Sequence, residues 1–137
     1  MRVVIDTNVL ISAIFWPGKP KQLLNHVRRK NITFVTSKHL LNELKGILIR
    51  EDKPFQLSEN EANQVLEAMG RLAEIVQTHS RITVCHDEMD NRVVECAIDG
   101  KAECIISGDF HLLGMGSYRG IKIMTVSDFL NLFEGTP

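Results

Sequence analysis

The sequence has few cysteines and no metal-binding cysteine pattern. Its three cysteines, Cys85, Cys96 and Cys104, include no Cys-x-x-Cys pair. A disulfide framework would use an even set, and a structural zinc site would use closely spaced pairs. We therefore expect three small apolar side chains that pack in the interior.

Long hydrophobic runs are also missing. No apolar stretch approaches the length that spans a bilayer, and Asp6 interrupts the first apolar run too early for a signal peptide. We therefore expect a cytoplasmic protein without a membrane segment. The length of 137 residues, with 44% hydrophobic and 24% charged residues, predicts one globular domain over residues 1–137.

Positive charge is not in surplus, since 16 basic residues face 17 acidic ones for a net charge of −1. Neutralising four acids with metal would leave 16 basic against 13 acidic residues, or +3. A basic rim around an acidic metal pocket is therefore compatible with the composition. The cluster Arg28-Arg29-Lys30, with Lys19 and Lys21 nearby, could track an RNA backbone or simply complement a helix end.

Short, mostly β-branched runs alternate with stretches of helical periodicity. Buried strands are predicted at Val3–Ile5, Thr33–Val35, Ile82–Cys85, Cys104–Ser107 and Lys122–Met124. Helices are predicted over residues 8–15, 20–30, 38–50, 59–79, 90–99 and 127–133, and the glycine-rich residues 114–120 as a flexible connection. This order predicts an α/β fold with three layers, in which helices flank a mostly parallel central sheet of about five strands.

Four acids fall near the carboxyl ends of these strands, where ligands bind in such sheets. Asp6 follows the first strand and Asp109 follows the fourth. Asp90 lies where the loop after the third strand enters its helix, and Glu43 lies within the helix after the second strand. The four side chains are therefore expected to point toward one end of the sheet.

Carboxylates gathered in a partly desolvated pocket repel one another and tend to take up protons. One or two hard divalent cations would remove this conflict and could activate water against a phosphate. Without a cluster of His or Cys ligands, Mg²⁺ or Mn²⁺ is favoured over zinc. Each acid alone also has an ordinary explanation: Asp6 and Asp90 as helix N-caps, Glu43 as a surface acid and Asp109 as a turn residue.

The segments around these acids resemble the PIN domain family. Residues 4–12 are similar to its opening, an apolar strand followed by Asp6-Thr7-Asn8. Ser37 with Glu43, the segment 90–97, and residues 105–110 with Ser107-Gly108-Asp109 resemble its later acidic elements. The matching segments occur in the family's order and span almost the whole chain.

This resemblance implies a metal-dependent endoribonuclease, often the toxin half of a VapC-type toxin–antitoxin pair. The catalytic and metal-binding residues would be Asp6, Glu43, Asp90 and Asp109, around one or two Mg²⁺ or Mn²⁺ ions. Thr7, Asn8 and Ser107 match supporting positions that orient the carboxylates. Many relatives carry another acid where this sequence has His111, so Asp87 either compensates or is a solvated loop acid; Glu95 is expected on the surface.

Other functions remain open at this point. A phospho-accepting receiver domain also binds Mg²⁺ at strand ends, but it would need paired acids after the first strand and a late lysine. A non-catalytic PIN-like module would bind RNA or a partner protein, although none of the four acids is missing. For a toxin, we expect RNA as the substrate and a protein antitoxin that covers the acidic pocket with a basic side chain. Exposed apolar helix faces are compatible with a homodimer.

Overall fold

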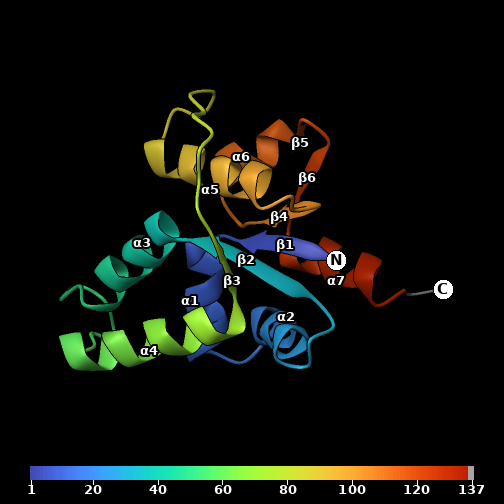
Figure 1. Cartoon of the computed structure of the whole chain (residues 1–137). Coiled ribbons are helices and arrows are strands. Elements are labelled where there is room, and N and C mark those ends of the chain that lie inside the picture. The colour runs from blue at the N-terminus through green and yellow to red at the C-terminus, as the bar shows by residue number, and fades with distance from the viewer. Residues whose placement is uncertain (136–137) are drawn as a thin grey trace.

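A computed structural model describes residues 1–135 of the chain. Strands and helices alternate along it (Figure 1), in the order β1 (Arg2–Ile5), α1 (Thr7–Phe15), α2 (Lys19–Arg28), β2 (Thr33–Ser37), α3 (Lys38–Leu48), α4 (Glu59–Leu72), β3 (Glu74–Val76), α5 (Glu88–Asp99), β4 (Cys104–Ile106), α6 (Phe110–Met115), β5 (Ser117–Tyr118), β6 (Ile121–Met124) and α7 (Val126–Phe133). This architecture confirms the predicted α/β fold class.

The six strands form one sheet in the order β3-β2-β1-β4-β6-β5. All neighbouring pairs are parallel except β5 and β6, which form an antiparallel hairpin. The chain moves outward from β1 to β2 and β3, and then returns to place β4 on the other side of β1. The carboxyl ends of β1 and β4 therefore flank the point where the strand order reverses, which is where open α/β sheets bind ligands.

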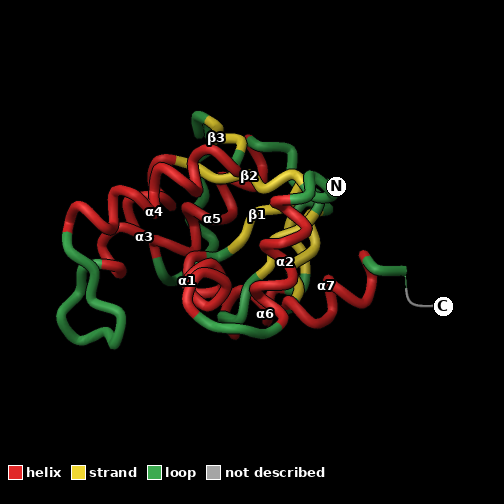
Figure 2. The backbone as a smooth tube through the Cα atoms, turned by 90° about the horizontal axis from the view of Figure 1, so that it is seen from below, coloured by secondary structure: helices red, strands yellow, loops and turns green. Residues whose placement is uncertain are grey.

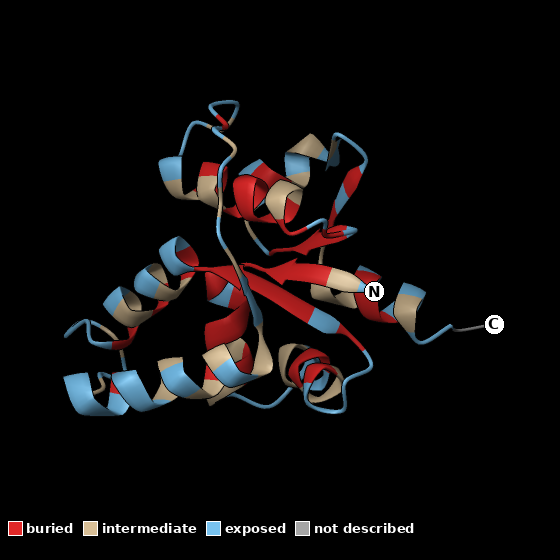
Figure 3. Ribbon diagram, in the orientation of Figure 1, coloured by how far each residue is buried: buried red, intermediate tan, exposed pale blue. Residues whose placement is uncertain are grey.

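Helices cover both faces of the sheet, as the buried parts of the ribbon in Figure 3 show. Successive residues of a strand point to opposite faces. Val3 and Ile5 accordingly pack against α1, α2, α4 and α7 on one side. Val4 packs with apolar residues of α5 and α6 on the other. The three layers follow from strands that are apolar on both faces.

Helix α3 lies across the end of the sheet and contributes to both layers. It begins at Ser37, whose hydroxyl accepts a hydrogen bond from the Leu40 backbone N–H at 3.4 Å. Leu40 packs in the layer of α5, whereas Leu44 and Leu48 pack in the layer of α1 and α4. This placement leaves Glu43 beside the carboxyl ends of the strands.

Two predictions for the middle of the chain, one helix end and one strand, are wrong. The helix expected over residues 59–79 ends at Leu72, and Glu74–Val76 forms the edge strand β3. The expected strand Ile82–Cys85 is instead part of the loop that leads to α5. Ile82 is buried in the layer of α5 and α6, so its apolar character serves packing without strand pairing.

The glycine-rich residues 114–120 are ordered, which corrects the expected flexible connection. They comprise the end of α6 and strand β5, followed by a two-residue turn at Arg119 and Gly120. Both turn residues have positive φ, 49° and 82°, as a tight hairpin turn requires.

The loop of residues 49–58 between α3 and α4 projects from the body (Figure 2). Among the described residues, no helix is long and apolar enough to cross a membrane. Cys96 and Cys104 are buried, Cys85 is half-buried, and all three are free thiols.

Candidate active site

Asp6 forms the floor of the candidate site at the carboxyl end of β1. It occupies the N-cap position of α1, but its side chain makes no capping hydrogen bond. Instead, Asp6 Oδ2 accepts a hydrogen bond from Ser107 Oγ at 2.6 Å, and the residue is only 8% exposed. The capping explanation therefore does not account for this buried carboxylate.

Ser107 links the ends of β1 and β4. It is fully buried, and its Oγ also accepts a hydrogen bond from the Asp109 backbone N–H at 2.9 Å. The backbone N–H of Asp6 donates to the Ile106 carbonyl at 2.9 Å, which extends the β1–β4 pairing to the acid itself. One hydroxyl thus fixes the segments that carry two of the four predicted acids.

Asp109 has a structural role as the N-cap of α6. Its Oδ1 accepts hydrogen bonds from the backbone N–H groups of His111 at 2.7 Å and Leu112 at 3.1 Å. His111 Nδ1 lies 3.7 Å from the same oxygen. These contacts hold the half-buried carboxylate in one orientation beside Ser107.

Glu43 reaches the site from the middle of α3 and is half-buried. Its carboxylate is hydrogen-bonded to the side chain of Thr7, a buried residue that opens α1. Burial raises the pKa of Glu43, the bond to Thr7 opposes the rise, and repulsion from Asp6 and Asp87 adds to it. The predicted support by Thr7 therefore has a counterpart in the structure.

Asp90 lies in the first turn of α5 and is 8% exposed. Burial, followed by repulsion from Asp109, Asp87 and Asp6, raises its pKa to about 6. At neutral pH this carboxyl is mostly ionised, but it is held in an environment that disfavours its charge.

The other three predicted acids interact with Asp6, although the four come from separate segments. Burial raises the pKa of Asp6. Hydrogen bonds from the Ser107 side chain and the Thr7 backbone lower it, and repulsion from Asp109 raises it again. Asp6 in turn raises the pKa of both Glu43 and Asp90. The sheet therefore brings together the set that the sequence placed at its carboxyl edge.

Asp87 is a fifth acid of this cluster, at a position where the sequence left open a compensating acid or a solvated loop acid. It is exposed and caps α5 by accepting the Met89 backbone N–H at 2.8 Å. It also raises the pKa of Asp6, Glu43 and Asp90 by repulsion. Its spacing of three residues before Asp90 was the available signal, because such positions share a helix face.

Glu95 is buried at 2% exposure, which corrects its expected surface position. Its carboxylate binds Arg92 at 2.6 Å and accepts the Ile82 backbone N–H at 2.9 Å. Asn91 holds the same loop by bonding both the N–H and the carbonyl of Cys85, at 2.8 and 3.2 Å. These α5 residues fix the loop of residues 77–87 that carries Asp87 to the cluster.

Two hollows flank the acids. One, of about 890 Å³, lies between α3, α5 and the loop of residues 77–87 and includes Glu43 and Asp87 in its wall. The other, of about 460 Å³, is lined by residues that include Asn8, Ser107 and Asp109. Asn8 is thus exposed beside the acids, in a place where a ligand could reach it.

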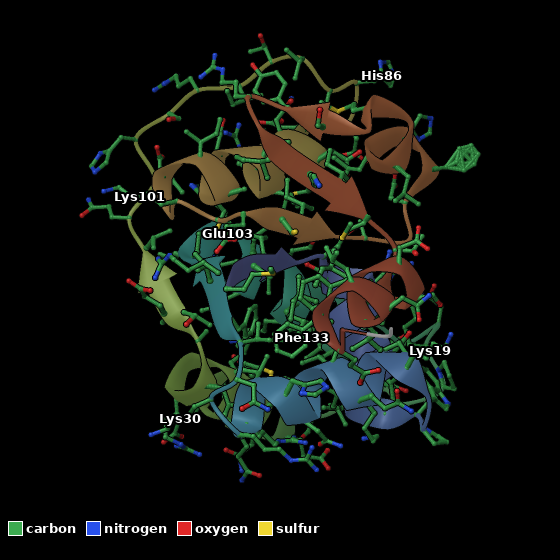
Figure 4. All side chains as sticks on the ribbon, turned by 90° about the vertical axis from the view of Figure 1, so that its right-hand side faces the viewer. Lys19, Lys30, His86, Lys101, Glu103 and Phe133 are labelled. Carbon is green, nitrogen blue, oxygen red and sulfur yellow. The ribbon has the colours of Figure 1, made fainter. Side chains whose placement is uncertain are left out.

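The predicted basic cluster is divided by α2. Lys19 begins this helix and Lys30 follows its end, and they lie on opposite sides of the view in Figure 4. Lys19 Nζ donates to Ser127 Oγ at 3.2 Å beside the smaller hollow. Only the Lys19 end therefore borders the acidic site.

The donor set suits a hard divalent cation. Within residues 1–135, no group of three or more Asp, Glu, His or Cys side chains is arranged so that it could hold a metal ion as it stands. Neighbouring carboxylates nonetheless help to raise the pKa values of Asp6, Glu43 and Asp90, so a cation would relieve repulsion that the protein alone leaves in place. Oxygen ligands of this kind suit Mg²⁺ or Mn²⁺.

Known proteins share the sequence pattern and the fold of this chain. Residues 2–111 match the PIN domain family. The uncharacterized protein MJ1680 of Methanocaldococcus jannaschii is 32% identical over 144 residues, covering 98% of this chain and 92% of that protein.

Two solved structures share the fold. VapBC2 from Rickettsia felis, solved bound to a DNA fragment from its promoter, has a TM-score of 0.63 at 16% identity, covering 90% of this chain and 97% of the matched one. PAE2754 from Pyrobaculum aerophilum has a TM-score of 0.62 at 11% identity, with coverages of 98% and 90%. The family match over most of the sequence establishes that this chain belongs to the PIN domain family.

Proposed function

We propose that this protein is a divalent-metal-dependent endoribonuclease that hydrolyses RNA phosphodiester bonds. The observation that carries the proposal is the convergence on Asp6 of three further carboxylates, Glu43, Asp90 and Asp109, each from a different segment. Membership of the PIN domain family supports the same activity.

In this proposal, Asp6, Glu43, Asp90 and Asp109 hold one or two Mg²⁺ or Mn²⁺ ions. The bound metal would supply an activated water and stabilise the charge that develops on the scissile phosphate. Ser107 keeps Asp6 in place through its 2.6 Å hydrogen bond, and Thr7 keeps Glu43 in place. Asp109 is held by the two backbone N–H groups that it caps at the start of α6. The chain would therefore fix the metal-binding carboxylates before metal binds.

We further propose that the protein is the toxin component of a toxin–antitoxin pair. Its fold is shared with a VapBC complex, and its acidic pocket offers concentrated negative charge. A protein antitoxin would cover that pocket with a basic side chain, because a buried arginine or lysine pairs with grouped carboxylates. A co-purified partner that docks away from Asp6 would contradict this part of the proposal.

Incubation with a pool of single-stranded RNA, with and without Mg²⁺ or Mn²⁺, tests the activity. The Asp90→Asn variant retains the shape of the side chain but loses its charge, whereas Asp52→Asn makes the same change at an exposed acid paired with Arg50. We expect metal-dependent cutting by wild type and Asp52→Asn, and none by Asp90→Asn. Metal-independent cutting, or full activity of Asp90→Asn, would refute the proposal.

A further inference from the structure

A large aromatic side chain lies exposed immediately beside the acidic site. Phe110 directly follows Asp109 and is 69% exposed, more than any other large hydrophobic residue within residues 1–135. By contrast, Phe34 and Phe129 are completely buried. Burying a phenylalanine side chain is favourable, so this exposed ring forgoes that stabilisation in the free protein.

The backbone beneath this ring is fixed relative to the acids. Phe110 is the first residue of α6, whose N-cap Asp109 accepts two backbone N–H groups of the helix. Asp109 is bonded to Ser107, and Leu112 anchors the helix in the core with no exposed surface. The ring therefore projects from a rigid turn that shares its first residue with the acid cluster.

His111 extends the aromatic surface. Its ring centroid lies 5.7 Å from that of Phe110 at a tilt of 37°, and its side chain is 82% exposed. His111 Nδ1 is also 3.7 Å from Asp109 Oδ1. The exposed His111 ring thus borders the Asp109 carboxylate, and the exposed Phe110 ring lies beside His111.

Lys19 is the end of the basic cluster that borders this site, and without bound metal the carboxylates oppose the approach of a phosphate backbone. Asp6, Asp87, Asp90 and Asp109 all interact there, and a phosphate backbone is repelled by their charge. Stacking between a nucleobase and an aromatic ring does not depend on charge and tolerates any base, because every base has a π-face. An exposed ring next to the acids can therefore hold a base whether or not a metal neutralises the carboxylates.

We propose that Phe110 is a positioning residue that stacks against a nucleobase flanking the scissile phosphate. The inference rests on the proposed ribonuclease activity and adds the contact that places the substrate. Single-stranded RNA is the preferred occupant, because its unpaired bases can splay onto an aromatic side chain. Phe110 takes no part in bond breaking.

Trp16 provides a matched control. It is also an exposed aromatic residue, at 44%, but it follows the last residue of α1, whereas Asp6 precedes the first. The two are ten residues apart along the helix axis, about 15 Å at 1.5 Å per residue. Its ring packs edge-on against Phe15 and Phe55, at centroid distances of 5.9 and 6.0 Å.

Cleavage kinetics on a short single-stranded RNA with one cut site provide the first test. We expect Phe110→Leu to raise KM about 10-fold with little change in kcat, because stacking contributes to holding the base. Phe110→Tyr should behave as wild type, since it keeps the ring, and Trp16→Leu should also leave KM unchanged. The proposal would be overturned if Phe110→Leu left KM unchanged, or if it lowered kcat about 10-fold without raising KM.

RNA binding without cleavage separates this inference from the proposed function. In the Asp90→Asn background, affinity is measured for the same RNA and for one with an abasic nucleotide beside the cut site. Removing the base should weaken RNA binding about 10-fold when Phe110 is present. It should not change the RNA affinity of the protein that also carries Phe110→Leu. This dependence would support stacking even if wild type did not cut RNA.

The opposite results are equally informative. The role of Phe110 would be refuted, and the nuclease left intact, if wild type cut RNA but the affinities did not differ. The four affinities compared are those of Asp90→Asn, with and without Phe110→Leu, for the intact and the abasic RNA. Unchanged RNA binding together with loss of a co-purified protein in Phe110→Leu would also overturn it, and would assign the ring to a protein partner.

Discussion

The Ser107 hydroxyl donates a 2.6 Å hydrogen bond to Asp6 Oδ2. The two residues are 101 positions apart in the chain and meet because β1 and β4 are parallel neighbours. The same hydroxyl oxygen accepts the Asp109 N–H, so Ser107 aligns the ends of both strands. The hydrogen bond lowers the pKa of Asp6 against a rise caused by burial.

Ser107→Ala should weaken metal binding and RNA cleavage by about 10-fold or more, as loss of a residue that orients a ligand commonly does. It should also lower the free energy of unfolding by about 1–3 kcal/mol, because the partly buried N–H of Asp109 loses its acceptor. Calorimetric Mg²⁺ or Mn²⁺ titration and chemical unfolding measure the two effects. Ser107→Thr keeps the hydroxyl and should retain metal affinity; equal affinities for all three proteins would contradict the assigned role.

Asp90→Asn should make the metal-free protein more stable at pH 7 while abolishing metal-dependent cleavage. The substitution removes a charge that burial and three neighbouring acids disfavour. The gain should be on the order of 1–3 kcal/mol, from about two units of raised pKa at 1.36 kcal/mol each. Urea unfolding in EDTA measures it, with Asp52→Asn as the exposed control; a less stable Asp90→Asn protein would count against repulsion at this site.

The stability of the metal-free protein should fall as the pH rises from about 4 to about 6. The pKa of Asp90 is about 6 in the folded protein and near 3.9 in an unfolded chain. Between these values the folded protein binds more protons, so raising the pH favours unfolding. The raised pKa values of Asp6 and Glu43 act with the same sign.

Unfolding midpoints across this pH range in EDTA should therefore decline for wild type and decline less for Asp90→Asn. Added Mg²⁺ or Mn²⁺ should raise the midpoint more at pH 7 than at pH 5, because protons and metal compete for the carboxylates. A metal-induced increase that is larger at pH 5 would contradict the proposed ligand set.

Asn91→Ala should loosen the loop of residues 77–87 without removing an acid. Asn91 bonds both backbone groups of Cys85, and its loss leaves a partly buried N–H and carbonyl without their partner. A stability loss of about 1–3 kcal/mol is expected. Amide hydrogen exchange should accelerate around Cys85 and Asp87, whereas Asn60→Ala on the exposed face of α4 should leave this loop unchanged. Unaltered exchange in Asn91→Ala would show that other contacts suffice to hold the loop.

Local sequence patterns predicted the strands correctly where a strand is buried on both faces of the sheet. The β-branched runs that became β1 and β2 were correctly placed, since strands buried on both faces are continuously apolar. The helix opened by Ser37 was also correct. In contrast, β3 is a short, half-exposed edge strand whose residues continue the helical pattern of α4, so only its pairing with β2 reveals it.

The sequence by itself determined the α/β class, the position of the acids after strands and helix starts, and the resemblance to PIN domains. Only the tertiary structure decided which of those acids interact, because parallel pairing of β1 with β4 joins residues about a hundred positions apart. It also added Asp87 to the cluster and moved Glu95 into the interior, where Arg92 neutralises it. Burial and through-space charge depend on neighbours distant in the chain, so the linear pattern left both roles of Asp87 open and could not show that Glu95 is buried.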